Sequence, residues 1–294
     1  IQQVSNDSYL KSYKPRSPLI NNDNILTSSI NFDGFNDDLS FNTEFTVYEN
    51  LSKANNDRYE HILPSYNLSK KFDNLKNLNG KLELNSSGSI KSYNTNILEK
   101  VNINDLVYNS DTKITSSGIE NSFNFIIKNV NTESDNSKVY KNNFDSSLDS
   151  LFELNSSYPL IKKEDKFDKM LTPKISLRYN PNKTKNKTED IRQINYDNVF
   201  DLNRLSFSDT LEGGESLTFG SKYSINDKLS NELFSAQIAN VIRIEEDENI
   251  PESSSIGQKN SNIVSSFVLN PSDNLNLNYQ VSMDQSFDKT EYQL

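Results

Sequence analysis

The chain of 294 residues contains no cysteine, no tryptophan and a single histidine, His61. Without cysteine, the chain can form neither disulfide bridges nor thiolate metal ligands. One histidine is too few for a histidine metal cluster or a serine or cysteine triad, so we interpret His61 as a polar strand residue. Because there are 41 acidic residues, carboxylate spacing singles out no catalytic pair. We predict that the chain is not an enzyme and has no cofactor and no metal site.

Long apolar runs are missing as well. No segment approaches the roughly 18 to 20 apolar residues of a membrane-spanning helix, which excludes a helical membrane protein. The net charge of −10 argues against binding nucleic acid through its phosphates. The sequence begins Ile1-Gln2-Gln3, without an initiator methionine or a signal segment. We therefore expect a fragment of a longer protein, and the missing signal does not argue for the cytoplasm.

The supply of apolar residues is small. Only 33% of residues are apolar and the mean hydropathy is −0.74, which is little for a soluble β-sandwich and overlaps the range of disordered chains. The 14 tyrosines and 16 phenylalanines argue against disorder, because many of them stand in alternating segments that give them a face to cover. A barrel with an apolar face toward lipid and a wet lumen resolves this conflict.

What the sequence does contain is apolar residues at every second position. This period places alternate residues on opposite faces of a β-strand. The pattern predicts strands at 175–179, 217–225, 233–244, 263–269 and 275–284, similar segments around 39–47, 82–84 and 119–127, a turn at 86–88, and exposed connections at 70–76 and 130–141. We predict that one set faces lipid (Leu217, Phe219, Tyr223, Leu275, Leu277 and Tyr279) and that another faces the lumen (Thr218, Lys222, Asn276 and Asn278).

The connections between these strands alternate in length. Long segments at about 180–216 and 245–262 alternate with short turns at 226–228 and 270–274, as in barrels with short periplasmic turns and long outer loops. We therefore predict an all-β, antiparallel transmembrane β-barrel, present here as a partial wall of roughly 12–14 strands in an open curved sheet. Segments 183–195 and 246–260 are expected at the cell surface. The acidic run 245–248 is interpreted as a solvated loop, and whether it binds cations stays open.

One stretch, residues 196–214, resembles the most recognisable segment of the LptD family, also called OstA or organic solvent tolerance protein, especially its alphaproteobacterial members. Residues 4–10, 63–64, 171–181 and 272–284 resemble further landmarks in the family's order, so the resemblance covers nearly the whole chain. Thr210 departs from the pattern, because arginine is usual there. The residues that match the family motif, to which we assign a structural or loop role, are Asn198, Phe200, Asn203, Arg204, Asp209, Glu212, Gly213 and Gly214.

The resemblance implies a protein of the Gram-negative cell outer membrane that inserts lipopolysaccharide (LPS) into the outer leaflet. Residues 1–294 would be the middle part of the C-terminal barrel domain, without the N-terminal jellyroll domain and the gate strands. Implied partners are LPS, the lipoprotein plug LptE, the periplasmic bridge components and outer-membrane lipid; the sequence assigns no LPS-contacting residue. The alternative is another outer-membrane barrel, a porin or a plugged nutrient receptor. A β-solenoid adhesin would show a fixed repeat that is not found.

Overall fold

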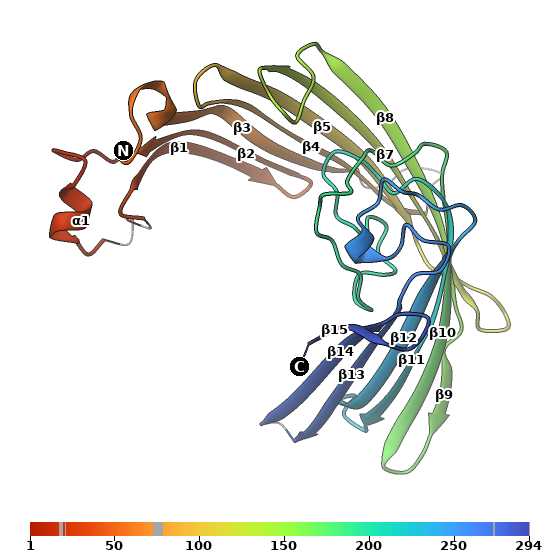
Figure 1. The fold of residues 1–294 in the computed structure, drawn as a ribbon. Coiled ribbons are helices and arrows are strands. Elements are labelled where there is room, and N and C mark those ends of the chain that lie inside the picture. The colour runs from red at the N-terminus through yellow and green to blue at the C-terminus, as the bar shows by residue number, and fades with distance from the viewer. Residues whose placement is uncertain (18–19, 21, 73–78, 273, 294) are drawn as a thin grey trace. The chain divides into compact units, whose positions relative to one another are not determined.

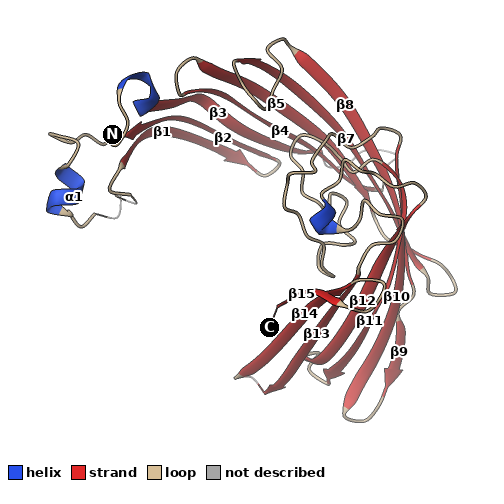
Figure 2. Ribbon diagram, viewed as in Figure 1, coloured by secondary structure: helices blue, strands red, loops and turns tan. Residues whose placement is uncertain are grey.

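The computed structural model describes residues 1–17, 20, 22–72, 79–272 and 274–293, and almost all of its regular structure is β-strand (Figure 1, Figure 2). No helix in these ranges is long and apolar enough to cross a membrane. The helices are α1 (Tyr9–Tyr13) and the short 3₁₀ helices η1 (Asn55–Arg58) and η2 (Glu252–Ser254). The strands are β1 (Ile25–Asn36), β2 (Leu39–Asn50), β3 (Tyr59–Phe72), β4 (Gly80–Tyr93), β5 (Ile97–Ser110), β6 (Lys113–Ile114), β7 (Glu120–Asp135), β8 (Asp145–Ser157), β9 (Leu160–Lys163), β10 (Phe167–Asn180), β11 (Gly214–Asp227), β12 (Glu232–Arg243), β13 (Ile263–Ser272), β14 (Leu275–Met283) and β15 (Lys289–Gln293).

Within the described residues these strands form one 15-stranded sheet. The order is β1-β2-β3-β4-β5-β7-β8-β10-β11-β12-β13-β14-β15, while the short strands β6 and β9 pair only with β7 and β10. Neighbours in the chain are therefore neighbours in the sheet, as in a meander of antiparallel strands. The prediction of an all-β chain with one antiparallel sheet is confirmed.

Several strands are longer than the sequence predicted. The turn expected at 86–88 is wrong, because β4 runs through it, with Gly88 beneath the ring of Tyr66. The connection expected at 130–141 is wrong for its first part, because β7 continues to Asp135 and Val130 is buried. Of the connection expected at 70–76, residues 70–72 belong to β3 and 73–76 lie outside the described residues, as does Asp273 of the predicted 270–274 turn.

The two faces of β11 differ in polarity and burial. Leu217 and Phe219 are 37% and 42% exposed, whereas Thr218 between them is fully buried. The antiparallel register carries this division to neighbouring strands, since Leu217 lies opposite Leu177 of β10 and Ile242 of β12. The apolar face is therefore the uncovered one and the polar face is covered, the reverse of a soluble sheet packed on a dry core.

By contacts the chain divides into two compact units. The first comprises Ile1–Leu75, Leu82–Val107 and Lys128–Leu148, and its small apolar core joins Leu10 of α1 to Leu26 and Leu51. The second comprises Lys76–Lys81, Tyr108–Ile127 and Asp149–Leu294 and holds a larger apolar core together with the family-motif segment.

Candidate functional site

The motif segment lies in the connection between β10 and β11, which folds back over the polar face of the second unit. Residues 181–213 form this connection, and residues 244–262 form the one between β12 and β13. The two connections, here called the inner loops, are hydrogen-bonded to each other: Lys187 N donates to Asn249 O at 2.8 Å and Arg192 N to Ser253 Oγ at 3.1 Å. They therefore fold as one layer and not as two separate loops.

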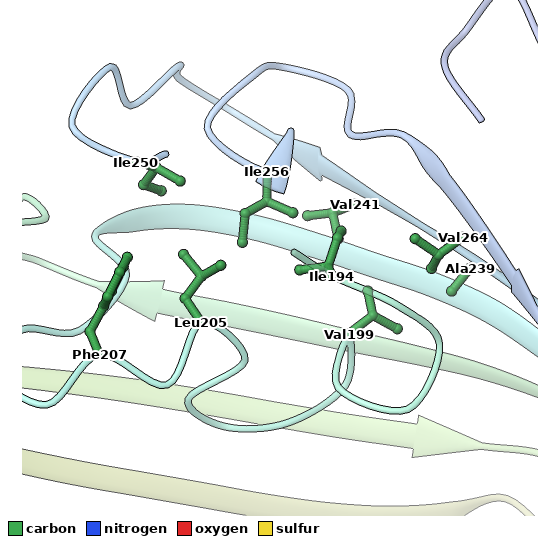
Figure 3. Packing of buried hydrophobic residues seen from close by; sticks show 9 residues of the cluster. All are labelled: Ile194, Val199, Leu205, Phe207, Ala239, Val241, Ile250, Ile256 and Val264. Carbon is green, nitrogen blue, oxygen red and sulfur yellow. The ribbon is translucent and has the colours of Figure 1, made fainter. Parts of the chain in front are cut away.

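An apolar core joins the inner loops to the sheet (Figure 3). The segments 183–195 and 246–260, which are expected at the cell surface, contain buried side chains: Ile194, Ile250 and Ile256 are 5%, 4% and 0% exposed. Burying each such side chain contributes roughly 1.5–3 kcal/mol, so the core is enough to hold the layer on the sheet. Its members are Ile194, Val199, Leu205 and Phe207 from the first loop, Ile250 and Ile256 from the second, and Ala239, Val241 and Val264 from β12 and β13.

Two residues of this core were a missed signal in the sequence. Ala239 and Val241 stand at odd positions of β12, on the same face as Ser235 and Arg243. A wet lumen offers no reason for two neighbouring apolar residues on the polar face. Their presence indicates that something apolar covers β12 there, and the inner loops are that cover.

Beside this core, three buried side chains form an ion cluster: Arg204 and Glu212 from the motif and Arg243 from β12. Arg204 Nε donates to Glu212 Oε2 at 2.7 Å, and its Nη2 donates to Glu212 Oε1. Arg243 Nη1 donates to Glu212 Oε1 at 2.6 Å, and its Nη2 donates to the carbonyl of Gly213. The three side chains are 0%, 5% and 1% exposed. One carboxylate thus connects a loop arginine to a strand arginine through charge-assisted hydrogen bonds.

Further hydrogen bonds tie Arg204 to β11. Its Nη1 donates to Thr218 Oγ1 at 2.9 Å and its Nη2 to Ser216 Oγ at 3.1 Å. Both hydroxyls stand on the polar face that the alternation in β11 defines. The motif arginine is therefore held by its own loop and by the strand that follows it.

The electrostatics favour a charged Glu212. Burial on its own raises the pKa of the Glu212 carboxyl, but the charges of the three surrounding arginines and the hydrogen bonds from Arg204 outweigh it. The net result lowers the pKa of Glu212 to about 2. The carboxylate is thus ionised at neutral pH, and protonating it would weaken the attachment of the loop.

A second buried pair lies nearby. Arg178 of β10 has its Nη1 at 3.5 Å from Glu153 Oε1 of β8, and its guanidinium donates to the carbonyl oxygens of Asp201 and Leu202 in the motif segment. Sequence reasoning included Arg178 in the landmark at 171–181 but assigned no site role to Arg178, Arg243 or Glu153. The available signal was their position on the polar face at two-residue spacing, where a buried charge requires a partner.

The remaining motif residues shape the loop or begin the strand. Asn198 Oδ1 accepts from Asn195 N at 2.9 Å, and Asn203 Nδ2 donates to Phe207 O at 3.0 Å. Asp209 lies apart from the ion cluster and pairs with Lys187 at 2.9 Å. The structure thus brings together Arg204, Glu212 and Gly213 and places the other motif residues around them.

The two motif glycines are required at their positions for different structural reasons. A Cβ on Gly213 would lie 2.5 Å from Asn182 O and 2.6 Å from Thr184 N, so this is a close approach of two backbone segments. Gly214 has φ +76°, the left-handed region that glycine enters at low cost, and it starts β11.

Phe200 borders a polar hollow of about 330 Å³ on the polar face. The Nζ of Lys174 lies 4.2 Å from the centre of the Phe200 ring, and Asn124 and Asn155 both donate to Glu153 Oε2. The Oδ1 atom of Asn155 is buried and has no hydrogen-bond partner within the described part of the chain. The hollow therefore presents amides and hydroxyls to the space beside the sheet, together with the charged side chains of Lys174 and Glu120 and the ring of Phe200.

The acidic run 245–248 is split by the fold. Glu245, Glu246 and Glu248 are exposed, whereas Asp247 accepts a hydrogen bond from Thr184 Oγ1 and stabilises the contact between the inner loops. Among the residues that the structure describes, no group of three or more histidine, cysteine or acidic side chains is arranged to hold a metal ion.

Comparison with models of protein families identifies the family of this chain. The family model described as LptD, LPS transport system D, matches residues 1–293. A search of curated proteins returns no match. The match includes the motif, the inner loops and the strands they cover, and it favours the LPS-assembly reading over a porin or a nutrient receptor. The chain therefore belongs to the LptD family, the outer-membrane barrels that insert LPS into the outer leaflet of the Gram-negative outer membrane and catalyse no reaction.

Proposed function

We propose that the inner loops line the route of the saccharide part of LPS along the polar face of the sheet, and that the ion cluster holds them there. The observation that carries this proposal is the burial of Arg204, Glu212 and Arg243, which joins the motif to β12. A loop that fills part of a lumen has to keep one position while a long substrate passes. Paired buried charges favour one arrangement, because every displaced arrangement leaves a charge without its partner.

The polar face has suitable chemistry for such a route. In the second unit the hollow beside Phe200 offers Asn124, Asn155 and Lys174. In the first unit a separate hollow of about 440 Å³ is lined by residues that include Asn42, Asn67 and Asn85. Amides exchange hydrogen bonds with sugar hydroxyls in both directions, donating and accepting.

The net charge of the chain is −10, and LPS is itself anionic, so the charge does not favour binding through a cationic surface. Lys128 is paired with Asp105 at 2.7 Å and Lys222 with Glu232 at 2.8 Å, so these lysines are not a cationic track. A largely neutral amide surface lets sugars pass without holding phosphates tightly. Passage requires contacts that are individually weak.

We further propose that the chain is the middle wall of the barrel and that its long connections point outward. The lipoprotein plug LptE and the periplasmic bridge are partners that the family implies. Neighbouring strands are antiparallel, so the inner loops leave one end of the sheet and the short β11–β12 turn leaves the other. An epitope inserted at Asn186 should be detected on intact cells, and one inserted at Ser272 should not. The opposite labelling would invert the orientation.

Photo-crosslinking during transport tests the route. The full-length protein with its lipoprotein partner is placed in phospholipid-only liposomes and supplied with LPS through the bridge components. A photoreactive residue at Asn155 should crosslink to LPS as soon as delivery starts. The matched control is Leu177, which is 52% exposed on the apolar face and should crosslink later, after LPS has entered the bilayer. Equal onset at both positions would contradict the proposed route.

A further inference from the structure

A hydrogen-bonded group of polar side chains lies on the apolar face of the sheet in the first unit. We call this group the amide network. Asn104 Nδ2 donates to Asn102 Oδ1 at 2.8 Å, and Asn131 Nδ2 donates to the same oxygen at 3.0 Å. Asn131 Nδ2 also donates to Asn129 Oδ1 at 2.6 Å. The members are Tyr66 of β3, Ser86 of β4, Asn102 and Asn104 of β5, Asn129 and Asn131 of β7, and Ser146 of β8.

The network is continuous across five strands. Ser86 Oγ donates to Asn104 Oδ1 at 2.7 Å and is 3.2 Å from the hydroxyl of Tyr66. At the other side, Ser146 Oγ donates to Asn131 Oδ1 at 2.7 Å. A chain of bonds of this extent fixes the orientation of each amide, so the group is pre-organised.

The network stands on the apolar face, at the edge of its apolar region. In β3, β4 and β5 the residues two positions nearer to the β1–β2 turn are Leu68, Leu84 and Leu106, which share a face with Tyr66, Ser86 and Asn104 because the side-chain period is two. On the far side of the network, Lys100 pairs with Glu133 at 3.3 Å, with both side chains more than 40% exposed. Apolar residues thus give way to amides and then to charges along the same face.

This sequence of side chains matches the border of a membrane. The outward apolar band of such a barrel is roughly 25 Å tall, and polar side chains within it are costly unless they lie near an interface. The connection 94–96 leaves the sheet at the same end as the inner loops, because the strands alternate in direction. With the orientation proposed above, the network lies at the headgroup level of the outer leaflet.

A hollow of about 270 Å³ adjoins the network. Its lining includes Tyr66, Asn102 and Asn131, together with Phe144, which is 68% exposed. The ring of Tyr66 lies across Gly88, where a Cβ would be only 2.7 Å from Tyr66 Cε1 and from Val101 O. The hollow therefore sets the fixed amides beside a mainly apolar wall that includes Ile90 and Phe144, and the paired side chains of Lys100 and Glu133 also line it. Gly88 leaves room for the Tyr66 ring.

We propose that the amide network and its hollow bind the first sugars of an LPS molecule that stands in the outer leaflet beside the barrel. The network consists of amides and hydroxyls, and Lys100, a cation that lines the hollow, is paired with Glu133. Its groups therefore suit the hydroxyls of a sugar, whereas phosphate recognition relies on arginine and lysine. This external site rests on the proposed orientation and is separate from the lumenal route, since it lies on the opposite face of the strands.

Binding of rough LPS tests the site. The full-length protein with its lipoprotein partner, in detergent, is titrated with rough LPS and, separately, with phosphatidylglycerol, and the midpoint of the LPS-induced shift in heat-modifiability is recorded. The double variant Asn102→Leu/Asn131→Leu should bind rough LPS about tenfold more weakly, because it loses the hydrogen bonds of two amides to the sugar. Tenfold corresponds to a total of about 1.4 kcal/mol. Its response to phosphatidylglycerol should not change, and its transport rate should stay that of the wild type.

The matched control is Asn42→Leu/Asn85→Leu, two amides of the opposite, polar face. It should leave the external site intact and slow transport. If the outer double variant does not fold, Tyr66→Phe provides a second test, because it removes the hydroxyl that is bonded to Asn102 and Ser86 and keeps every amide. Unchanged LPS affinity in the outer variants would overturn the proposal, as would an equal loss for phosphatidylglycerol. A transport defect confined to the polar-face control bears on the lumenal route alone, so the two proposals fail separately.

Discussion

Replacing Glu212 by glutamine should detach the inner loops from the sheet. Glu212→Gln keeps the size of the side chain and removes the carboxylate that Arg204 and Arg243 share; these arginines are 0% and 1% exposed. Breaking a buried pair by removing one partner costs roughly 3–5 kcal/mol. Since each 1.4 kcal/mol is about a factor of ten, the fraction of molecules with open loops should rise by roughly a hundredfold to several thousandfold.

Limited proteolysis measures this opening. Trypsin cleavage at Lys183, an exposed residue of the first inner loop, reports the open population when reclosing is faster than cleavage. The control Asp209→Asn removes the pair with Lys187, whose side chains are 17% and 20% exposed, and should change the rate less than about tenfold. Equal cleavage rates in the two variants would refute the argument that the buried cluster holds the loops.

The remaining predictions concern pH, the glycine and the faces of the sheet. The pKa of Glu212 is lowered from 4.5 to about 2, so the stability that the ionised carboxylate contributes is complete above about pH 4.5 and is lost as the pH falls toward 2. This contribution amounts to roughly 3 kcal/mol. Trypsin sensitivity should follow the titration in the wild type but not in Glu212→Gln. Gly213→Ala should increase trypsin cleavage at Lys183, because the new Cβ would lie 2.5 Å from Asn182 O. Gly257→Ala in the other inner loop should do the same, because its Cβ would lie 2.6 Å from Asp247 O. Cysteines at Lys222 or Asn278 should react with a water-soluble maleimide in membranes, and cysteines at Phe219, Tyr223 or Leu277 should not. Thr218 is left out of this comparison because the bond from Arg204 and the covering loop bury it. The reverse preference would invert the faces.

The strands of the C-terminal half were predictable because their alternation is strong. Segments 217–225 and 275–284 correspond to β11 and β14 within a few residues. The turn at 86–88 was mispredicted because serine and glycine are turn residues in isolation. Gly88 is instead required inside β4, where the Tyr66 ring crosses it. Local composition does not contain that cross-strand contact.

The position of the inner loops was not predictable from their composition. The first loop is polar on average, and its buried residues, such as Val199 and Leu205, are too dispersed to suggest a layer. Nor does spacing along the chain indicate that Arg243, 31 residues from Glu212, completes the ion cluster. Ala239 and Val241 were the local sign that a loop covers β12, because apolar residues are not expected on a polar face that borders water.

The departure at position 210 indicates how the cluster tolerates change around it. Thr210, which stands where the family usually has arginine, is fully buried, and its hydroxyl lies 3.4 Å from Asp149 Oδ2 of β8. The same carboxylate accepts from Leu211 N at 3.3 Å. Asp149 therefore accepts from the side chain of Thr210 and from the loop backbone, which ties the first inner loop to β8. The attachment to β11 and β12 uses the buried charges of Arg204, Glu212 and Arg243. The attachment to β8 uses a hydroxyl and a backbone amide, so substituting Thr210 should cost less than substituting Glu212.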